Sequence, residues 1–91
     1  MTNQVHCAHI LVKTEQEAKD VLEDLIDGTS FASVAQQKSL CPSRKQGGDL
    51  GRFGRGQMVK PFETAAFALE KGQTSQPVKT EFGWHIIKRL G

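Results

Sequence analysis

Two histidines lie inside apolar segments near opposite ends of this chain. His9 begins the run His-Ile-Leu-Val, and His85 lies within Gly-Trp-His-Ile-Ile. A lone histidine in a strand is usually a core residue with one hydrogen bond, whereas two on paired strands can contact each other. Adjacent imidazoles repel when both are charged, so we expect a pair that is neutral or shares one proton. With the hydroxyl of Thr80 fixing the tautomers, such a pair predicts a rigid polar frame rather than a general base.

A glycine-punctuated segment, 47–62, carries large apolar side chains that predict a small pocket. Met58 and Phe62 are four positions apart, and Leu50 precedes them. These side chains are open to a second interpretation as ordinary core, because Phe62 shares a predicted helix face with two alanines. A methionine in a glycine-rich loop is less typical of a core, and small ligand pockets are commonly lined by methionine and phenylalanine. We therefore expect an apolar pocket near the titratable histidines.

Cys41 is open to three interpretations. It is a packed or surface thiol, a nucleophile with His9 or His85 as its base, or one ligand of a metal site that also includes Cys7 and both histidines. Structural zinc usually takes its ligands in close pairs on turns. Cys7 and His9 alternate along a strand, and the sequence has no second close pair. The pattern therefore predicts no metal site.

The composition predicts one globular domain that spans residues 1–91. With 37% hydrophobic and 24% charged residues, the chain is ordinary for a globular protein, and no cofactor is expected at this size. No apolar run approaches the roughly 20 residues needed to span a bilayer, and the N-terminus has no basic or apolar leader region. Two cysteines are too few to staple a secreted mini-protein. We expect a cytoplasmic protein that does not contact membranes.

Charge is distributed unevenly along the chain. Residues 1–30 hold two lysines and six acids, whereas residues 31–91 hold ten basic residues and four acids. The acidic part falls mostly on one predicted helix and is typical of a solvated helix face. The basic remainder is scattered rather than blocked, and the Gly-Arg-Phe-Gly-Arg-Gly segment at 51–56 occurs once, within a folded pattern. Nucleic acid is therefore not an expected partner.

The order of the predicted elements indicates an α+β fold. Apolar runs predict strands at 5–13, up to Phe53, at 76–79 and at 84–90. Capping residues, proline and glycine predict helices at 14–28, from Ser30, as a short turn before Gly48, and at 61–72. Along the first strand, Cys7, His9 and Leu11 share one face. The first and last strands are the most apolar, so we expect them to be the central pair.

Four segments of the chain resemble the parvulin family of peptidyl-prolyl cis/trans isomerases. They are Cys7-Ala-His-Ile-Leu-Val-Lys13, Gly47-Gly-Asp-Leu-Gly51, Gly56-Gln-Met-Val-Lys-Pro-Phe-Glu63 and Glu81-Phe-Gly-Trp-His-Ile-Ile-Lys88. They follow the family's order over nearly the whole chain, whose length resembles that of free-standing prokaryotic members. The resemblance implies a parvulin-like (FKBP-like) four-stranded antiparallel sheet surrounded by about four helices, in the order β-α-α-α-β-α-β-β.

The resemblance also implies roles for two groups of residues. The first group is expected at the reacting bond, with His9 and His85 as the paired frame, Thr80 as its hydroxyl partner, and Cys41 beside the amide, where other members have aspartate. The second group is expected to bind substrate. In it, Leu50, Met58 and Phe62 match the proline-ring pocket, Gln57 matches a position that flanks the pocket, and Phe82 suggests an apolar substrate surface.

The implied activity is rotation about Xaa-Pro bonds in proline-containing peptides and in unfolded or folding proteins. Cys41 is expected to tune polarity rather than attack, because a family that accepts aspartate here does not need a thiolate nucleophile. Phosphate-directed parvulins carry a long basic loop after the first strand, whereas here Lys13 leads straight into Thr14 and an acidic helix. We therefore expect a monomeric, non-covalent isomerase that is not phosphate-directed. The alternative is a chaperone-like module that binds such segments with little turnover.

Overall fold

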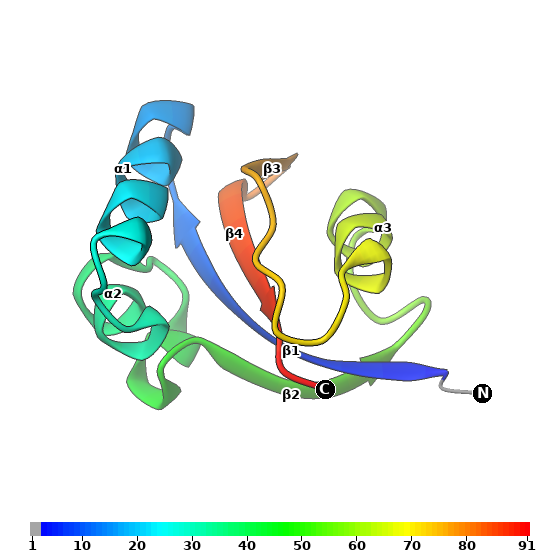
Figure 1. The fold of residues 1–91 in the computed structure, drawn as a ribbon. Helices are drawn as coiled ribbons and strands as arrows, with labels where there is room; N and C mark the ends of the chain where they lie inside the picture. The colour runs from blue at the N-terminus through cyan, green and yellow to red at the C-terminus, as the bar shows by residue number, and fades with distance from the viewer. Residues whose placement is uncertain (1–2) are drawn as a thin grey trace.

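In the computed structural model, which describes residues 3–91, four strands form one antiparallel sheet (Figure 1). The strands are β1 (Gln4–Val12), β2 (Asp49–Gly54), β3 (Val78–Thr80) and β4 (Gly83–Arg89), in the sheet order β2-β1-β4-β3. The helices are α1 (Glu15–Ile26), α2 (Phe31–Lys38), the 3₁₀ helix η1 (Pro42–Gln46) and α3 (Lys60–Ala68). The predicted element order is confirmed, with η1 as the short third helix. Residues 1 and 2, with which the predicted domain and its N-terminus begin, lie outside the described residues.

The first and last strands form the centre of the sheet, as their apolar character predicts. β1 and β4 pair in an antiparallel register that runs without a break from Cys7 opposite Arg89 to Val12 opposite Trp84. Strands that are buried on both faces carry nearly continuous apolar runs, because neither face meets water. Both central strands therefore need helices on each side of the sheet.

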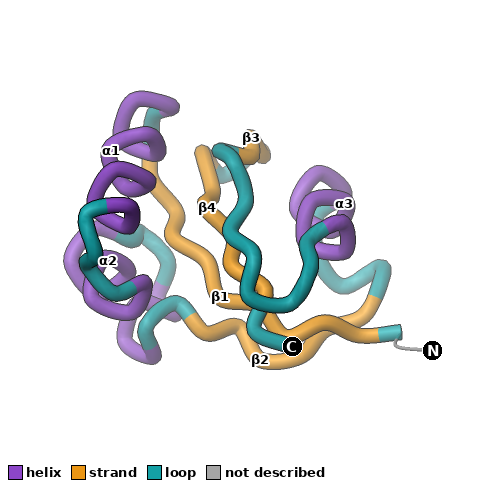
Figure 2. Tube along the Cα trace, in the orientation of Figure 1, coloured by secondary structure: helices purple, strands orange, loops and turns teal. Residues whose placement is uncertain are grey.

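Helices cover both faces of the sheet (Figures 1 and 2). Helices α1 and α2 pack on one face, over a core that includes Ile10, Val12, Val21, Val34 and Ile86. Helix α3 packs on the opposite face, over a core that includes Val5, Cys7, Phe53, Phe62 and Ile87. Because side chains alternate along a strand, neighbouring residues of β1 and of β4 belong to different cores.

Local chemistry sets the starts of α1 and α2. The hydroxyl of Thr14 accepts a hydrogen bond from the Glu17 amide at 3.1 Å, and that of Ser30 accepts from the Ser33 amide at 3.1 Å. The Glu17 carboxylate in turn accepts from the Thr14 hydroxyl. Helix α1 ends at Ile26, just before Gly28, which has a φ of +101°. The predicted caps of both helices are confirmed.

Helix α3 ends earlier than its apolar pattern predicts. The pattern extends the helix to Gly72, but α3 ends at Ala68, and Leu69 is extended with φ −76° and ψ 146°. The Leu69 carbonyl accepts a hydrogen bond from Arg89 Nη1 at 2.7 Å, and the Gly72 amide donates to the Arg89 carbonyl at 2.7 Å. The chain leaves the helix because backbone groups of Leu69 and Gly72 form hydrogen bonds with Arg89 of β4 instead. The next strand, β3, correspondingly begins at Val78 rather than at position 76.

Candidate active site

His9 and His85 lie side by side on the face of the sheet that α3 covers. In the β1–β4 register, His9 is opposite Ile87 and His85 is opposite Leu11, so the two histidines are diagonal neighbours. Their Nδ1 atoms are 2.9 Å apart, and their rings stack with centroids 5.1 Å apart. His85 Nε2 lies 2.7 Å from the hydroxyl oxygen of Thr80. The predicted contact between the histidines and the predicted contact with Thr80 are both confirmed.

Burial keeps both imidazoles uncharged at neutral pH. His9 is 5% exposed and His85 is 4% exposed. Removal from water lowers the pKa of His9 to about 4, with a smaller effect from the repulsion that a protonated His85 would exert. Burial also lowers the pKa of His85 to about 4. Two neutral imidazoles that meet through their Nδ1 atoms share one proton there, so one ring donates and the other accepts. The Thr80 hydroxyl, which also accepts from the Phe82 amide at 3.2 Å, holds the other nitrogen of His85.

Phe62 connects the histidine pair to an apolar pocket. Its ring is nearly perpendicular to both imidazoles, with centroids 5.5 Å from His9 and 5.1 Å from His85. Phe62 belongs to the core under α3, and Leu50 and Met58 pack against the same core while lining the pocket. The sequence leaves open whether these three side chains form core or pocket. In the structure they do both, because the pocket opens directly above the core.

The pocket has a volume of about 500 Å³. Eight of the residues predicted at the site line it, namely His9, Cys41, Leu50, Gln57, Met58, Phe62, Phe82 and His85. Thr80 contacts His85 from outside this lining. The lining also includes Leu11, Leu40, Pro42 and Val59, which the sequence analysis did not assign to the site. Leu11 could have been assigned to the site from the sequence, because strand alternation places it on the same face as His9. The other three depend on how the chain folds back.

Ser39 holds the Cys41 segment against β1, a role that the sequence analysis missed. Ser39 is 2% exposed, and its hydroxyl accepts hydrogen bonds from the amides of Leu11 at 3.1 Å and Cys41 at 3.3 Å. The Leu40 amide donates to the Leu11 carbonyl at 2.8 Å. These bonds attach segment 39–41 to the end of β1 and bring Leu40 and Cys41 to the pocket. A serine after the last turn of a helix has no distinctive sequence signature.

Gly48 allows the chain to pass directly beside His9. Its carbonyl accepts a hydrogen bond from the His9 amide at 2.9 Å, and its φ is +85°. A β-carbon at Gly48 would collide with the His9 carbonyl oxygen. Glycine adopts positive φ without steric penalty and has no β-carbon to clash. The glycine pair that marks this segment in the sequence therefore secures the backbone of His9.

Gln57 and Phe82 border the pocket and differ in their contacts. The Gln57 side-chain oxygen accepts a hydrogen bond from the Gly54 amide at 2.9 Å, so this side chain also braces its own loop. Phe82 is 63% exposed and extends the apolar lining toward solvent. Gln57 thus flanks the pocket while bonded to its own loop, and Phe82 presents exposed apolar surface at the pocket edge.

The geometry does not favour the metal-ligand interpretation of Cys41. Within residues 3–91, no three histidine, cysteine, aspartate or glutamate side chains are grouped so that they could hold a metal ion. Cys7 is fully buried, and burial raises the pKa of its thiol to about 11, which Arg89 partly offsets. A thiol with this pKa is protonated at neutral pH. No helix in the described part of the chain is long and apolar enough to cross a membrane.

Comparison with known proteins identifies the family. The family model described as "Rotamase: PPIC-type PPIASE domain" matches residues 9–91. The chain belongs to the PPIC-type rotamase family. The chain is 52% identical over 86 residues to the foldase protein PrsA 4 of Bacillus cereus, an alignment that covers 93% of this chain and 31% of that protein. The chain spans about a third of the length of the curated relatives that it matches.

Two solved structures match this chain over 95% or more of their own length. NmPin, the parvulin of Nitrosopumilus maritimus, is 48% identical with a TM-score of 0.90, and the match covers 100% of this chain and 99% of that one. CsPin from Cenarcheaum symbiosum is 53% identical with a TM-score of 0.87, covering 100% of this chain and 95% of that one. The predicted parvulin resemblance and the predicted fold are confirmed.

Proposed function

We propose that this rotamase domain accelerates rotation about Xaa-Pro bonds in peptides and in folding proteins by a non-covalent mechanism. The observation that carries the proposal is an apolar pocket of about 500 Å³ bordered by two buried, uncharged histidines. A proline ring is small, rigid and apolar, and Leu50, Met58 and Phe62 offer it an apolar surface. The volume also leaves room for the peptide units on either side of the ring.

Amide resonance is the barrier that the site has to lower. It gives the C–N bond double-bond character and a rotational barrier of about 18–20 kcal/mol, so uncatalysed exchange takes tens to hundreds of seconds. Exchange in milliseconds requires an acceleration of about 10⁴–10⁵, or about 5.5–7 kcal/mol. Resonance also places negative charge on the carbonyl oxygen, which an apolar site disfavours. A pocket that grips the ring while the acyl side turns binds the twisted amide better than either planar isomer.

In this mechanism the site residues act through position and polarity, because no covalent bond is made or broken. The neutral pair of His9 and His85, held by Thr80, forms a wall that does not change its charge at neutral pH. Cys41, which is half-buried at the pocket, sets the polarity beside the turning carbonyl. Cys41 does not act as a nucleophile in this mechanism.

We propose that the residue before proline is preferentially apolar or basic and is not required to be phosphorylated. Leu40 and Phe82 are 54% and 63% exposed and extend the lining of the pocket with apolar surface. Lys13 and Thr14 alone connect β1 to α1, and the first turn of α1 carries Glu15 and Glu17. One lysine beside two carboxylates is a poor site for a phosphate dianion, because the acids repel it.

The test is exchange NMR with short Xaa-Pro peptides that carry apolar, basic, acidic or phosphorylated residues at Xaa. We expect faster cis/trans exchange in the presence of the protein, greatest for apolar and basic residues. Acceleration confined to phosphorylated peptides would contradict the substrate proposal. Saturable binding without acceleration of any peptide would contradict the isomerase proposal and support the chaperone-like alternative, a module that binds proline-containing segments.

We further propose that the protein works as a cytoplasmic monomer without a cofactor or a nucleic-acid partner. Within residues 3–91 both cysteines are free thiols, which suits a reducing compartment. Light scattering of the purified protein should give the mass of one chain, and activity should survive a chelator. A dimeric mass, loss of activity in chelator, or binding to polynucleotide at physiological salt would contradict the respective part of this proposal.

A further inference from the structure

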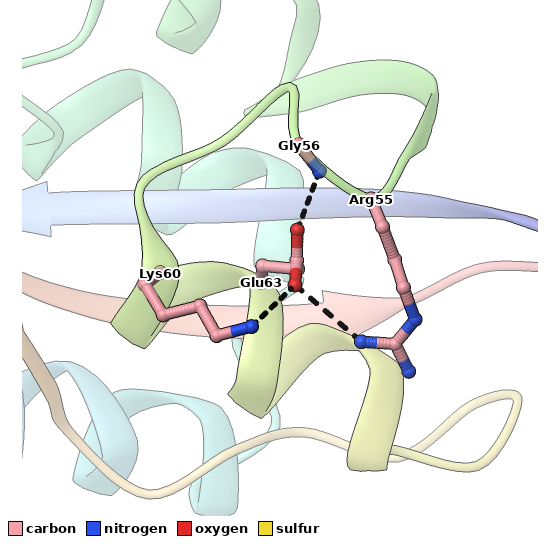
Figure 3. Close-up of polar contacts among 4 residues, drawn as sticks. All are labelled: Arg55, Gly56, Lys60 and Glu63. Atoms are coloured by element: carbon pink, nitrogen blue, oxygen red, sulfur yellow. Dashed lines mark hydrogen bonds and ion pairs between the residues drawn. The ribbon is translucent and has the colours of Figure 1, made fainter.

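Glu63 is a buried carboxylate beside the pocket. Its side chain is 5% exposed, and it directly follows the pocket residue Phe62 in α3. Its Oε1 atom accepts a hydrogen bond from the Gly56 amide at 2.6 Å, while Oε2 lies 3.4 Å from Arg55 Nη1 and 3.4 Å from Lys60 Nζ (Figure 3). A buried carboxylate is normally paired or hydrogen-bonded, because burial of an isolated charge is unfavourable.

The two basic side chains lie over the Glu63 carboxylate but contribute little to holding it in one position. Arg55 and Lys60 approach the carboxylate from different sides in Figure 3, and their side chains are 65% and 81% exposed. Ion pairs in which the cationic side chain stays largely in solvent contribute little to stability. The short hydrogen bond from Gly56 is typical of an amide that donates to a charged oxygen, and it is the main reason that the pKa of Glu63 lies below its usual value. The contact with Gly56 is therefore the specific one.

Gly56 lies in loop 55–59, which carries Met58 to the pocket. Gln57 braces the start of this loop through the Gly54 amide. At its end, the residue that caps α3 is Val59, whose apolar side chain cannot accept a hydrogen bond. The bond from Gly56 to Glu63 attaches the middle of the loop to the first turn of α3. This attachment is two residues from Met58 and restricts how far its backbone can move.

We propose that Glu63 is a positioning residue of this site: its carboxylate holds loop 55–59 against α3 and thereby places Met58 in the wall of the proline pocket. The kinetic consequence rests on the isomerase function proposed above. The hydrogen bond and the order of Met58 do not depend on that function. Glu63 acts on the substrate through the loop and takes no part in the reaction itself.

The first experiment compares Glu63→Ala and Glu63→Gln in the isomerisation assay. Alanine removes the acceptor that ties the Gly56 amide to α3, so KM should rise about tenfold while kcat changes less than about threefold. Glutamine keeps a carbonyl oxygen at the same place, so its KM should stay within about threefold of wild type. Glu23→Ala and Glu23→Gln, at an exposed position of α1, are the matched controls and should behave as wild type. An unchanged KM in Glu63→Ala would overturn the proposal, as would a glutamine variant as weak as the alanine variant.

The second experiment observes Met58 directly and does not require turnover. The chain contains two methionines, Met1 and Met58, so ¹³C-methyl labelling gives two signals, and Met58→Ala assigns them. The Met58 signal should move toward its random-coil position in Glu63→Ala and remain in place in Glu63→Gln. An unmoved signal in Glu63→Ala would overturn the positioning role. Absence of turnover in the wild type, by contrast, would overturn the proposed isomerase function and leave this comparison intact.

Amide hydrogen exchange in the wild type covers the case in which Glu63→Ala does not fold. We expect the Gly56 amide to exchange at least about tenfold more slowly than an unstructured amide, because it is hydrogen-bonded to a buried acceptor. Exchange of Gly56 at the unstructured rate would overturn the proposal.

Discussion

One side of the pocket is built from the sheet and the other side from loops, and the two sides differ in how they are held. On the sheet side, His9, His85 and Thr80 come from three neighbouring strands, are all buried, and contact one another through side-chain hydrogen bonds. On the loop side, Met58 lies on loop 55–59 and Cys41 on segment 39–41, and both are partly exposed. The loop side is held by a few bonds to the backbone.

Because of this difference, we expect replacements on the sheet side to affect stability first and replacements on the loop side to affect substrate binding first. Residues on the sheet side are part of the core that the whole fold depends on, so their replacement should first lower the free energy of unfolding. Residues on the loop side can move without unfolding the sheet, so their replacement should first weaken substrate binding. The following predictions test that separation.

The largest effect is expected for His85→Ala. The substitution creates a cavity and removes both hydrogen-bond contacts of His85, so the free energy of unfolding should fall by about 3 kcal/mol and the melting temperature by roughly 12–20 °C. Urea and thermal denaturation measure both. The control is His6→Ala, because His6 pairs with Asp49 while 31% exposed and should contribute less than about 1 kcal/mol. An inactive His85→Ala protein that is as stable as the control would instead indicate direct acid–base participation.

Acid should also lower the stability that the buried histidine pair contributes on the sheet side. An unfolded histidine binds a proton below about pH 6.5, whereas the folded pair resists protonation until about pH 4. The unfolded state therefore binds more protons between these values, and stability should fall with decreasing pH by up to a few kcal/mol. The lowered pKa values of Asp49 and Glu63 act only below about pH 4.5. A flat free energy of unfolding between pH 6.5 and 5 would contradict the buried, neutral pair.

The loop side should show the opposite pattern in Met58→Ala. Met58 is partly exposed, so its truncation should lower the free energy of unfolding by less than about 1 kcal/mol. It removes a wall of the pocket, so KM or the peptide dissociation constant should rise about tenfold. Ile26→Ala, at an apolar side chain that is 82% exposed on α1, is the matched control. A stability loss comparable to that of His85→Ala would show that the two sides are not separable.

The smallest effect is expected for Cys41→Asp. A carboxylate cannot replace a thiolate nucleophile, but it can serve as a polar group at the edge of the pocket. We therefore expect kcat/KM within about threefold of wild type, a change of less than about 1 kcal/mol in the activation barrier. Isomerisation assays with Cys41→Asp and Cys41→Ser measure this. Loss of all turnover in a folded Cys41→Asp protein would restore the nucleophilic interpretation.

Much of the sheet side follows from local sequence. Strand alternation alone places His9 and Leu11 on one face, and the apolar character of the end strands predicts that they pair at the centre of the sheet. The same reasoning extends α3 to Gly72, which is wrong, because the helix ends where β4 offers hydrogen bonds to the chain that follows. Periodicity describes an element in isolation and contains no information on such a competing partner.

Residue types and their spacing predict which faces are apolar, where helices are capped, and which side chains could form a frame and a pocket. The contacts that position these side chains form only in the folded chain. Ser39 binds Leu11 and Cys41, and Glu63 binds the loop beside Met58. Serine and glutamate are common surface residues, and only the fold takes them out of water. Their partners are backbone amides, which every residue except proline has, so no spacing of residue types could reveal these bonds before the chain had folded.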